Sequence, residues 1–334
     1  MPRQARLDVP GALHHVMGRG IEGRALFSGS EDREDFLARI QRLVEKESLV
    51  VYAWALMPNH FHLLVRTTKV PLSHVMRKLM SGYAGYFNRK HHRVGHVFSN
   101  RFKSILCEEE SYFLELVRYI HLNPVRAGII KSMEELGISP LTGHSSLTGK
   151  HMRPWQSVGD VLNRFSGKGR MALSAYVTFV EEGKNRSEPK NLEGGGLVRS
   201  HGGWGALLNL RRGREQYVSD ERVLGGSDFV EGLLKEAEKD LEERGELLRQ
   251  WDVKKLVEIV CEKVGAEPNQ LGGGGKLLPV TRAREGICYL WVKKMRRSGG
   301  ELARSIGMKT VTVYEAAVRG EKNAAKWDEI IKTI

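Results

Sequence analysis

Two histidines separated by one residue, His60 and His62, are the side chains whose type and spacing most directly predict chemistry. They follow the turn residues Pro58 and Asn59 and alternate with apolar side chains, which is typical of a short strand. Because successive strand side chains point to opposite faces, His60 and His62 share one face. Two imidazoles on a rigid strand can form half of a metal site, although such a pair is more often only hydrogen-bonded.

A second candidate pair, Tyr119 and Asn123, lies at the end of an expected helix that precedes Pro124. Residues four apart project from the same helical face, one turn from each other. A tyrosine phenol can attack phosphorus, and an amide oxygen can complete a metal site. The alternative for Tyr119 is a half-buried helix tyrosine with a solvated hydroxyl. Other tyrosines are weaker candidates: Tyr112, about 10 Å earlier on the same helix, and Tyr83 and Tyr86 on the preceding helix.

The segment from Arg66 to Lys103 contains nine Lys or Arg, four His and no acidic residue. Such a field favours a phosphate-binding surface, while the ordinary alternative is a solvated helix face. Two aromatic residues, Phe98 and Phe102, can either stack on unpaired bases or belong to the core. The residues expected to guide a nucleic-acid backbone are Arg66, Arg77, Lys78, Arg101 and Lys103.

The elements that position these residues follow from periodicity and turn signals. We expect strands at 11–18, 49–57, 60–66 and 101–107, and helices at 31–47, from Pro71 to Lys90, and at 108–122. The order βαββαβα predicts an α+β domain, a ferredoxin-like antiparallel sheet with helices on one face. The open sheet face is then available to a substrate.

Three separated segments, 54–65, 95–103 and 119–128, resemble the single-tyrosine HUH transposases, especially the REP-associated tyrosine transposases of bacteria. The resemblance implies an endonuclease and strand transferase that cleaves and rejoins single-stranded, hairpin-associated DNA through a 5′-phosphotyrosine. It implies that His60 and His62 bind Mg²⁺ or Mn²⁺, that Asn123 is the third ligand and that Tyr119 is the nucleophile. In this superfamily the tyrosine helix serves its own subunit or a partner, so a homodimer is compatible with the sequence.

The C-terminal region predicts a mostly helical domain. After an expected helix at 281–297, Ala303, Gly307 and Val313 have the spacing of a helix-turn-helix, which resembles the duplex-binding domain of bacterial replication initiators. Residues 281–334 contain twelve Lys or Arg against six acids. The alternative is a helical bundle used for dimerisation. The residues expected to meet base edges are Lys309, Thr310, Thr312 and Tyr314, and those expected to hold phosphates are Arg296, Arg297 and Arg304.

Composition sets the wider expectation for this chain of 334 residues. A net charge of +13 and a pI near 9.6 favour a nucleic-acid partner. The sequence contains no apolar run that predicts a membrane span and no signal peptide, and its three scattered cysteines predict no disulfide framework. We therefore expect a cytoplasmic protein.

Four regions are expected along the chain: a nuclease domain at 1–130, an irregular extension with a flexible linker at 131–226, a connector helix at 227–250 and the DNA-binding domain at 251–334. Two other functions remain open. One is a non-catalytic sequence-specific DNA-binding regulator, and the other is a metal-dependent phosphodiesterase that uses water, with Tyr119 structural.

Overall fold

The computed structural model describes residues 9–184 except 10, 47 and 69, residues 222–235 except 227 and 234, and residues 251–332 except 274, 276 and 296. The chain divides into two compact units, residues 1–234 and 235–334. Most of the expected linker and connector helix lies outside the described residues, although residues 228–233 are helical.

The first unit is organised around a five-stranded sheet with the order β2-β3-β1-β4-β5. The four long strands pair antiparallel, and β5 pairs parallel with β4. The bounds are β1 Leu13–Arg19, β2 Leu49–Met57, β3 His60–Thr67, β4 Lys103–Cys107 and β5 Val223–Leu224. The α+β class and the four long strands expected from the sequence are confirmed.

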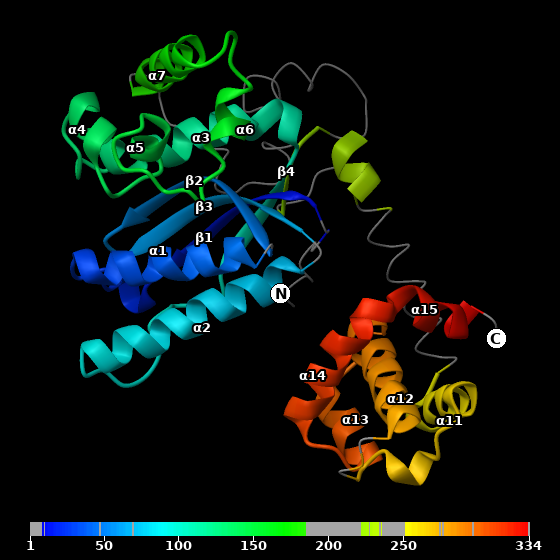
Figure 1. Cartoon of the computed structure of the whole chain (residues 1–334). Helices are drawn as coiled ribbons and strands as arrows, with labels where there is room; N and C mark the ends of the chain where they lie inside the picture. The colour runs from blue at the N-terminus through cyan, green and yellow to red at the C-terminus, as the bar shows by residue number, and fades with distance from the viewer. Residues whose placement is uncertain are drawn as a thin grey trace, which may run out of the picture. The chain divides into compact units, whose positions relative to one another are not determined.

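Helices cover both faces of this sheet (Figure 1). One face carries the 3₁₀ turn Ile21–Gly23, α1 Ser30–Glu45 and α2 Leu72–Lys90. The other face carries α3 Glu109–Arg126, followed by α4 Met133–Ile138, α5 His144–Leu147, α6 Val158–Leu162 and α7 Arg170–Lys184. The structure therefore differs from the expectation in one respect, because α3 lies on the face that was expected to stay open.

Strand alternation explains the two cores. Phe61 and Leu63 face α1 and α2, whereas Leu64 and Ile105 face α3. The helix α3 also continues three residues past Asn123, where the sequence predicts its end. Pro124 removes only one amide donor, and the amide of Ala127 still reaches the carbonyl of Asn123 at 3.0 Å.

Both edges of the sheet are completed by segments from much later in the chain. On β2, Val51 forms a bridge with Gln156 and Ala55 forms one with Thr142. On the opposite edge, β5 covers β4, and Leu106 and Val223 share a small apolar cluster with Val230. Residues beyond 130 therefore contribute directly to this fold.

The second unit is a helical domain with its own core, in which the side chains of Trp251, Trp291 and Trp327 are buried. Its helices are α11 Val253–Val264, α12 Leu278–Cys288, α13 Gly299–Ile306, α14 Thr310–Gly320 and α15 Ala324–Lys332, with a π-helical segment at Tyr289–Lys294 and 3₁₀ turns at Pro268–Gln270 and Glu321–Asn323. Within the described parts of both units, none of the helices combines the length and the apolarity needed to span a membrane.

Candidate active site

The hairpin between β2 and β3 presents the two histidines. Its turn is held from outside, because the amide of Leu26 donates to the Pro58 carbonyl at 2.7 Å and the amide of Gly20 donates to the Asn59 carbonyl at 2.8 Å. A side chain on Gly20 would collide with the carbonyl oxygen of Arg24. The turn is therefore rigid, and the strand that follows it places His60 and His62 on one face, as predicted from the sequence.

Each of these imidazoles has its Nδ1 occupied by a neighbouring group. Nδ1 of His60 lies 2.7 Å from Oδ1 of Asn59, which only accepts, so this nitrogen donates. Nδ1 of His62 lies 3.0 Å from Nε2 of His15. When His62 donates there, both histidines keep the lone pair on Nε2, which is the usual arrangement of a metal-binding imidazole.

The environment of His62 keeps its ring neutral. Burial, together with the neighbouring His15 and His60, lowers the pKa of His62 well below its ordinary value. Its Nε2 is buried and has no hydrogen-bond partner among the residues that the structure describes. A neutral imidazole with an unsatisfied buried nitrogen fits a metal ligand.

Tyr119 on α3 meets these histidines on the same sheet face. Its ring centroid lies 6.0 Å from that of His62 and 5.9 Å from that of His15, and both contacts are edge-to-face. The guanidinium carbon of Arg126 lies 5.8 Å from the centroid of the Tyr119 ring. The structure thus brings together three residues that are far apart in the sequence, His15, His62 and Tyr119.

A cavity of about 570 Å³ opens beside the two histidines. Its lining includes His60, His62, Arg19, Asn59, Arg101 and Lys103. Tyr119 is 5% exposed and does not line this cavity, although its ring contacts His62, which does. A ligand in the cavity therefore meets the imidazoles and three basic side chains first.

The fit to a divalent cation depends on the ligands beside the two histidines. In the described ranges no group of three or more His, Cys, Asp or Glu is placed to hold a metal ion. A further protein ligand would therefore be another oxygen donor, and the amide of Asn123, half-buried one turn after Tyr119, has suitable chemistry. Imidazoles alone would favour Zn²⁺, whereas an added amide oxygen and water suit Mg²⁺ or Mn²⁺.

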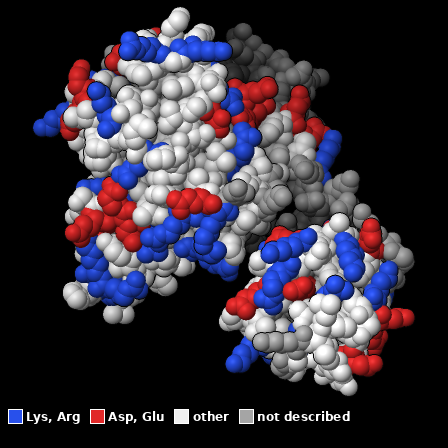
Figure 2. All heavy atoms as spheres, viewed as in Figure 1, with Lys and Arg blue, Asp and Glu red and all other residues white. Residues whose placement is uncertain are grey.

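The predicted basic residues fall into three places. Arg101 and Lys103 line the cavity, while Arg77 and Lys78 are exposed on α2, where Lys and Arg side chains gather in Figure 2. Arg66 lies about 20 Å further along β3 from His60 and forms an ion pair with Glu109. The structure does not bring Arg66 to the site.

The remaining aromatic candidates are resolved by the fold. Tyr83 belongs to the core on the opposite face of the sheet, where its hydroxyl donates to the Leu26 carbonyl. Tyr112 packs at the margin of the α3 core. Phe102 is a buried core residue and Phe98 is half-buried, so Phe98 is the one with an accessible ring.

Sequence reasoning did not single out His15 or Arg19. Both lie on β1, which pairs with β3 in a register that sets Arg19 opposite His60 and Met17 opposite His62. The tandem His14–His15 was a visible signal, but only the strand order shows that His15 reaches His62.

In the second unit, α13 and α14 are joined by a tight turn in which Gly307 has a φ of +70°. Arg304, Lys309 and Thr310 are exposed, and Thr312 is half-buried. Arg297 stacks on Trp291, with its guanidinium carbon 4.5 Å from the ring centroid. Arg296 lies outside the described residues.

Comparison with known proteins finds a similarity to one family within the first unit. Residues 9–123 match the family described as "Transposase IS200 like". No curated protein matches the sequence. Among solved structures, a REP-associated tyrosine transposase bound to a REP hairpin is similar at 17% identity, over 48% of this chain and 93% of that chain, with a TM-score of 0.38.

The matched segment contains the residues that line the cavity beside the histidines. The family match includes the two histidines, the basic residues Arg101 and Lys103, and α3 as far as Asn123. The matched segment ends before α4. The helices α4 to α7, which pack beside α3, therefore belong to the fold of this unit but lie outside the matched segment.

Proposed function

We propose that this protein is a metal-dependent DNA strand transferase that cleaves and rejoins single-stranded, hairpin-associated DNA, with Tyr119 as the nucleophile. The observation that supports the proposal is the cluster of a neutral His62, whose buried Nε2 has no partner among the described residues, and the Tyr119 ring against it. The family of the domain and the acid-free basic segment between Arg66 and Lys103 favour DNA as the substrate.

Each residue has a stated task in this proposal. His60 and His62, with the Asn123 amide, hold a divalent cation, Mg²⁺ or Mn²⁺, which when bound offsets negative charge on the phosphate. Asn59 and His15 orient the two imidazoles through their Nδ1 atoms. The basic side chains at the cavity position the DNA backbone.

The transfer itself is an exchange at phosphorus. The Tyr119 oxygen forms a bond to phosphorus, the bond from phosphorus to the 3′ oxygen breaks, and the proton lost by the phenol is balanced by the proton that the released 3′ oxygen takes up to become a hydroxyl. The product is a 5′-phosphotyrosine. Because Tyr119 is buried and does not line the cavity, the proposal requires its side chain to turn toward the phosphate when DNA binds.

The test is a denaturing gel of the full chain incubated with Mg²⁺ or Mn²⁺ and labelled single-stranded hairpin DNA from the repeats that flank the gene. We expect a covalent protein–DNA band that is lost in Tyr119→Phe and His62→Ala. Tyr112→Phe, on the same helix and outside the cavity, is the matched control and should retain the band.

The other outcomes assign the alternatives. Cleavage that survives Tyr119→Phe would identify a phosphodiesterase that uses water. Tight binding without cleavage at any metal concentration would identify a DNA-binding regulator. Either result would overturn Tyr119 as the nucleophile.

We further propose that the second unit binds duplex DNA through α13 and α14. The tight turn at Gly307 and the exposure of Arg304, Lys309 and Thr310 support a helix-turn-helix, with α14 entering the major groove. The same unit used as a dimerisation bundle would bind no duplex. Gel-shift titration of the full chain with duplex DNA distinguishes the two.

A further inference from the structure

A second cavity, of about 810 Å³, lies between α2 and the segment 95–102 of the first unit. It shares Ser99, Asn100 and Arg101 with the cavity beside the histidines. The proposed chemistry uses only the first cavity, so the second has no role in it. Its size falls within the range of pockets that hold a small organic ligand.

The lining of the second cavity divides into an apolar part and a polar part. The apolar part includes the buried Met76 and Met80, and the half-buried Ala84 and Phe98. The polar part is exposed and includes Ser73, His74, Arg77, Ser81 and Arg101. A ligand that fits both parts has a flat apolar body and a negatively charged group.

The charged side chains of the second cavity indicate which negative group the ligand carries. The lining of the second cavity contains no acidic residue, and Arg77 contacts the His74 ring at 3.1 Å rather than a carboxylate. An exposed guanidinium at the rim of an apolar pocket suits a phosphate. Thioether and aromatic side chains within the pocket suit the face of a nucleobase.

Both walls of the cavity are anchored before any ligand binds. The segment 95–102 is held by the amide of Ile21, which donates to the Val97 carbonyl at 3.0 Å, and by its own Ser99 amide, which donates to the Arg19 carbonyl at 3.0 Å. On the α2 side, Nδ2 of Asn88 donates to the Gly95 carbonyl at 2.9 Å. Little conformational entropy is therefore lost when the cavity is filled.

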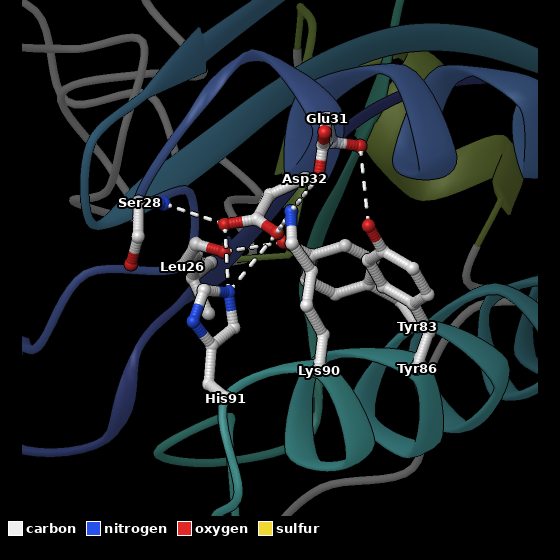
Figure 3. A network of polar contacts seen from close by, with 8 residues as sticks. All are labelled: Leu26, Ser28, Glu31, Asp32, Tyr83, Tyr86, Lys90 and His91. Atoms are coloured by element: carbon white, nitrogen blue, oxygen red, sulfur yellow. Dashed lines mark hydrogen bonds and ion pairs between the residues drawn. The ribbon is translucent and has the colours of Figure 1, made fainter.

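The C-terminal end of α2 is fixed by a polar network at the start of α1 (Figure 3). The carboxylate of Asp32 is fully buried and receives Nζ of Lys90 at 2.8 Å and Nε2 of His91 at 3.0 Å. The amide of Ser28 donates to the same carboxylate at 2.8 Å. This network ties the end of α2 to α1. The chain then continues into the segment 95–102, which forms the second wall of the cavity.

We propose that this second cavity, the α2 groove, binds one unpaired nucleotide of the DNA strand, with its base beside Phe98 and Met80 and its phosphate at Arg77. The inference rests on the proposed function, because it assumes that the DNA strand runs from the scissile phosphate in the first cavity, past Ser99–Arg101, into the second cavity. Continuity of the two cavities favours a nucleotide within the strand over a free one. The α2 groove then sets which unpaired base, relative to the cleaved bond, the protein accepts.

The experiment combines base removal with filling of the groove. Full-length protein is titrated by fluorescence anisotropy with labelled hairpin DNA in which each unpaired nucleotide is replaced, one at a time, by an abasic residue. In the wild type we expect a single position at which loss of the base raises Kd about tenfold. In Ala84→Met, which narrows the groove, intact DNA should bind about tenfold more weakly, and the abasic change should have no further effect.

Such non-additivity is the signature of a shared site. A second filling variant, Ser81→Leu, changes an exposed residue of the groove and guards against misfolding of the first. Arg42→Ala removes an exposed positive charge from α1, outside the groove, and should retain the full abasic effect.

The outcomes separate this inference from the proposed function. Additive effects of base removal and groove filling, or no sensitive position in the wild type, would overturn the nucleotide site even if the covalent adduct forms. Loss of the adduct with the coupling intact would overturn the proposed chemistry and leave the nucleotide site supported.

Discussion

Replacing Tyr176 by phenylalanine is expected to destabilise the first unit strongly. The Tyr176 hydroxyl lies 2.9 Å from Nδ1 of His121 on α3 and 2.6 Å from Nδ1 of His144, and all three side chains are buried. Without the hydroxyl, two buried ring nitrogens lose their partner, and each unsatisfied group costs about 1–3 kcal/mol. We therefore expect the free energy of unfolding to fall by about 3 kcal/mol.

The direction of the hydrogen bonds in this network follows from His121. Its Nε2 is buried with no partner in the described part of the chain, and an unpaired acceptor is tolerated better than an unpaired N–H. His121 therefore donates from Nδ1 to the Tyr176 oxygen, and the hydroxyl donates to Nδ1 of His144. One hydroxyl thus satisfies two histidines of opposite roles.

Thermal unfolding of the full chain, followed by calorimetry, measures the effect. For a unit of this size a loss of about 3 kcal/mol lowers Tm by about 6–12 °C. The matched control is Tyr86→Phe, whose hydroxyl lies 3.5 Å from the Glu31 carbonyl oxygen at the surface and whose loss should lower Tm by less than about 2 °C. A Tyr176→Phe variant that behaves like this control would refute the hydrogen-bond reasoning.

Three other measurements test the structure. Burial lowers the pKa of His144 to about 4 from 6.5, so as pH falls the unfolded chain binds a proton that the folded chain does not. Urea titrations should show at least about 3 kcal/mol of stability lost between pH 6.5 and 4, because burial also lowers the pKa of His62 and of His121, and a flat profile would contradict this. Burial alone would raise the pKa of Asp32, but hydrogen bonds from Lys90 and His91 hold it below its usual value. Asp32→Asn should therefore reduce the free energy of unfolding by about 3 kcal/mol in urea. Glu31→Gln should have a much smaller effect, because its ion pair with Lys90 is exposed. Arg304→Ala should weaken duplex binding and reduce the slope of log K against log salt by about 1, and an unchanged slope would place the duplex elsewhere.

The sequence predicted the elements whose pattern is local. The Pro58–Asn59 turn and the alternation after it placed His60 and His62 on one face, and the apolar periodicity located α1 and α2. The four long strands followed from short apolar runs bounded by turn residues. These signals lie within ten to twenty residues of chain, which is the range over which side-chain periodicity is informative.

The features that the sequence did not predict depend on which elements are neighbours in space. The apolar residues of α3 surround much of the helix, as Phe113, Val117 and Leu122 illustrate, so its periodicity does not say which sheet face it covers. The role of His15 requires β1 to lie beside β3. The short helices between residues 131 and 184 carry no long period, and β5 has only two residues, so neither gives a local signal.

The partners of the sheet edges have a consequence for synthesis of the chain. When the ribosome has released only the first 130 residues, β2 lacks its bridges to Thr142 and Gln156, and β4 lacks β5. Exposed strand edges recruit other strands, so the nascent domain is open to aggregation until about residue 233 has emerged. A fragment cut at the end of the family match would stay in that unfinished condition, and expression of the soluble domain should require the chain through Leu233.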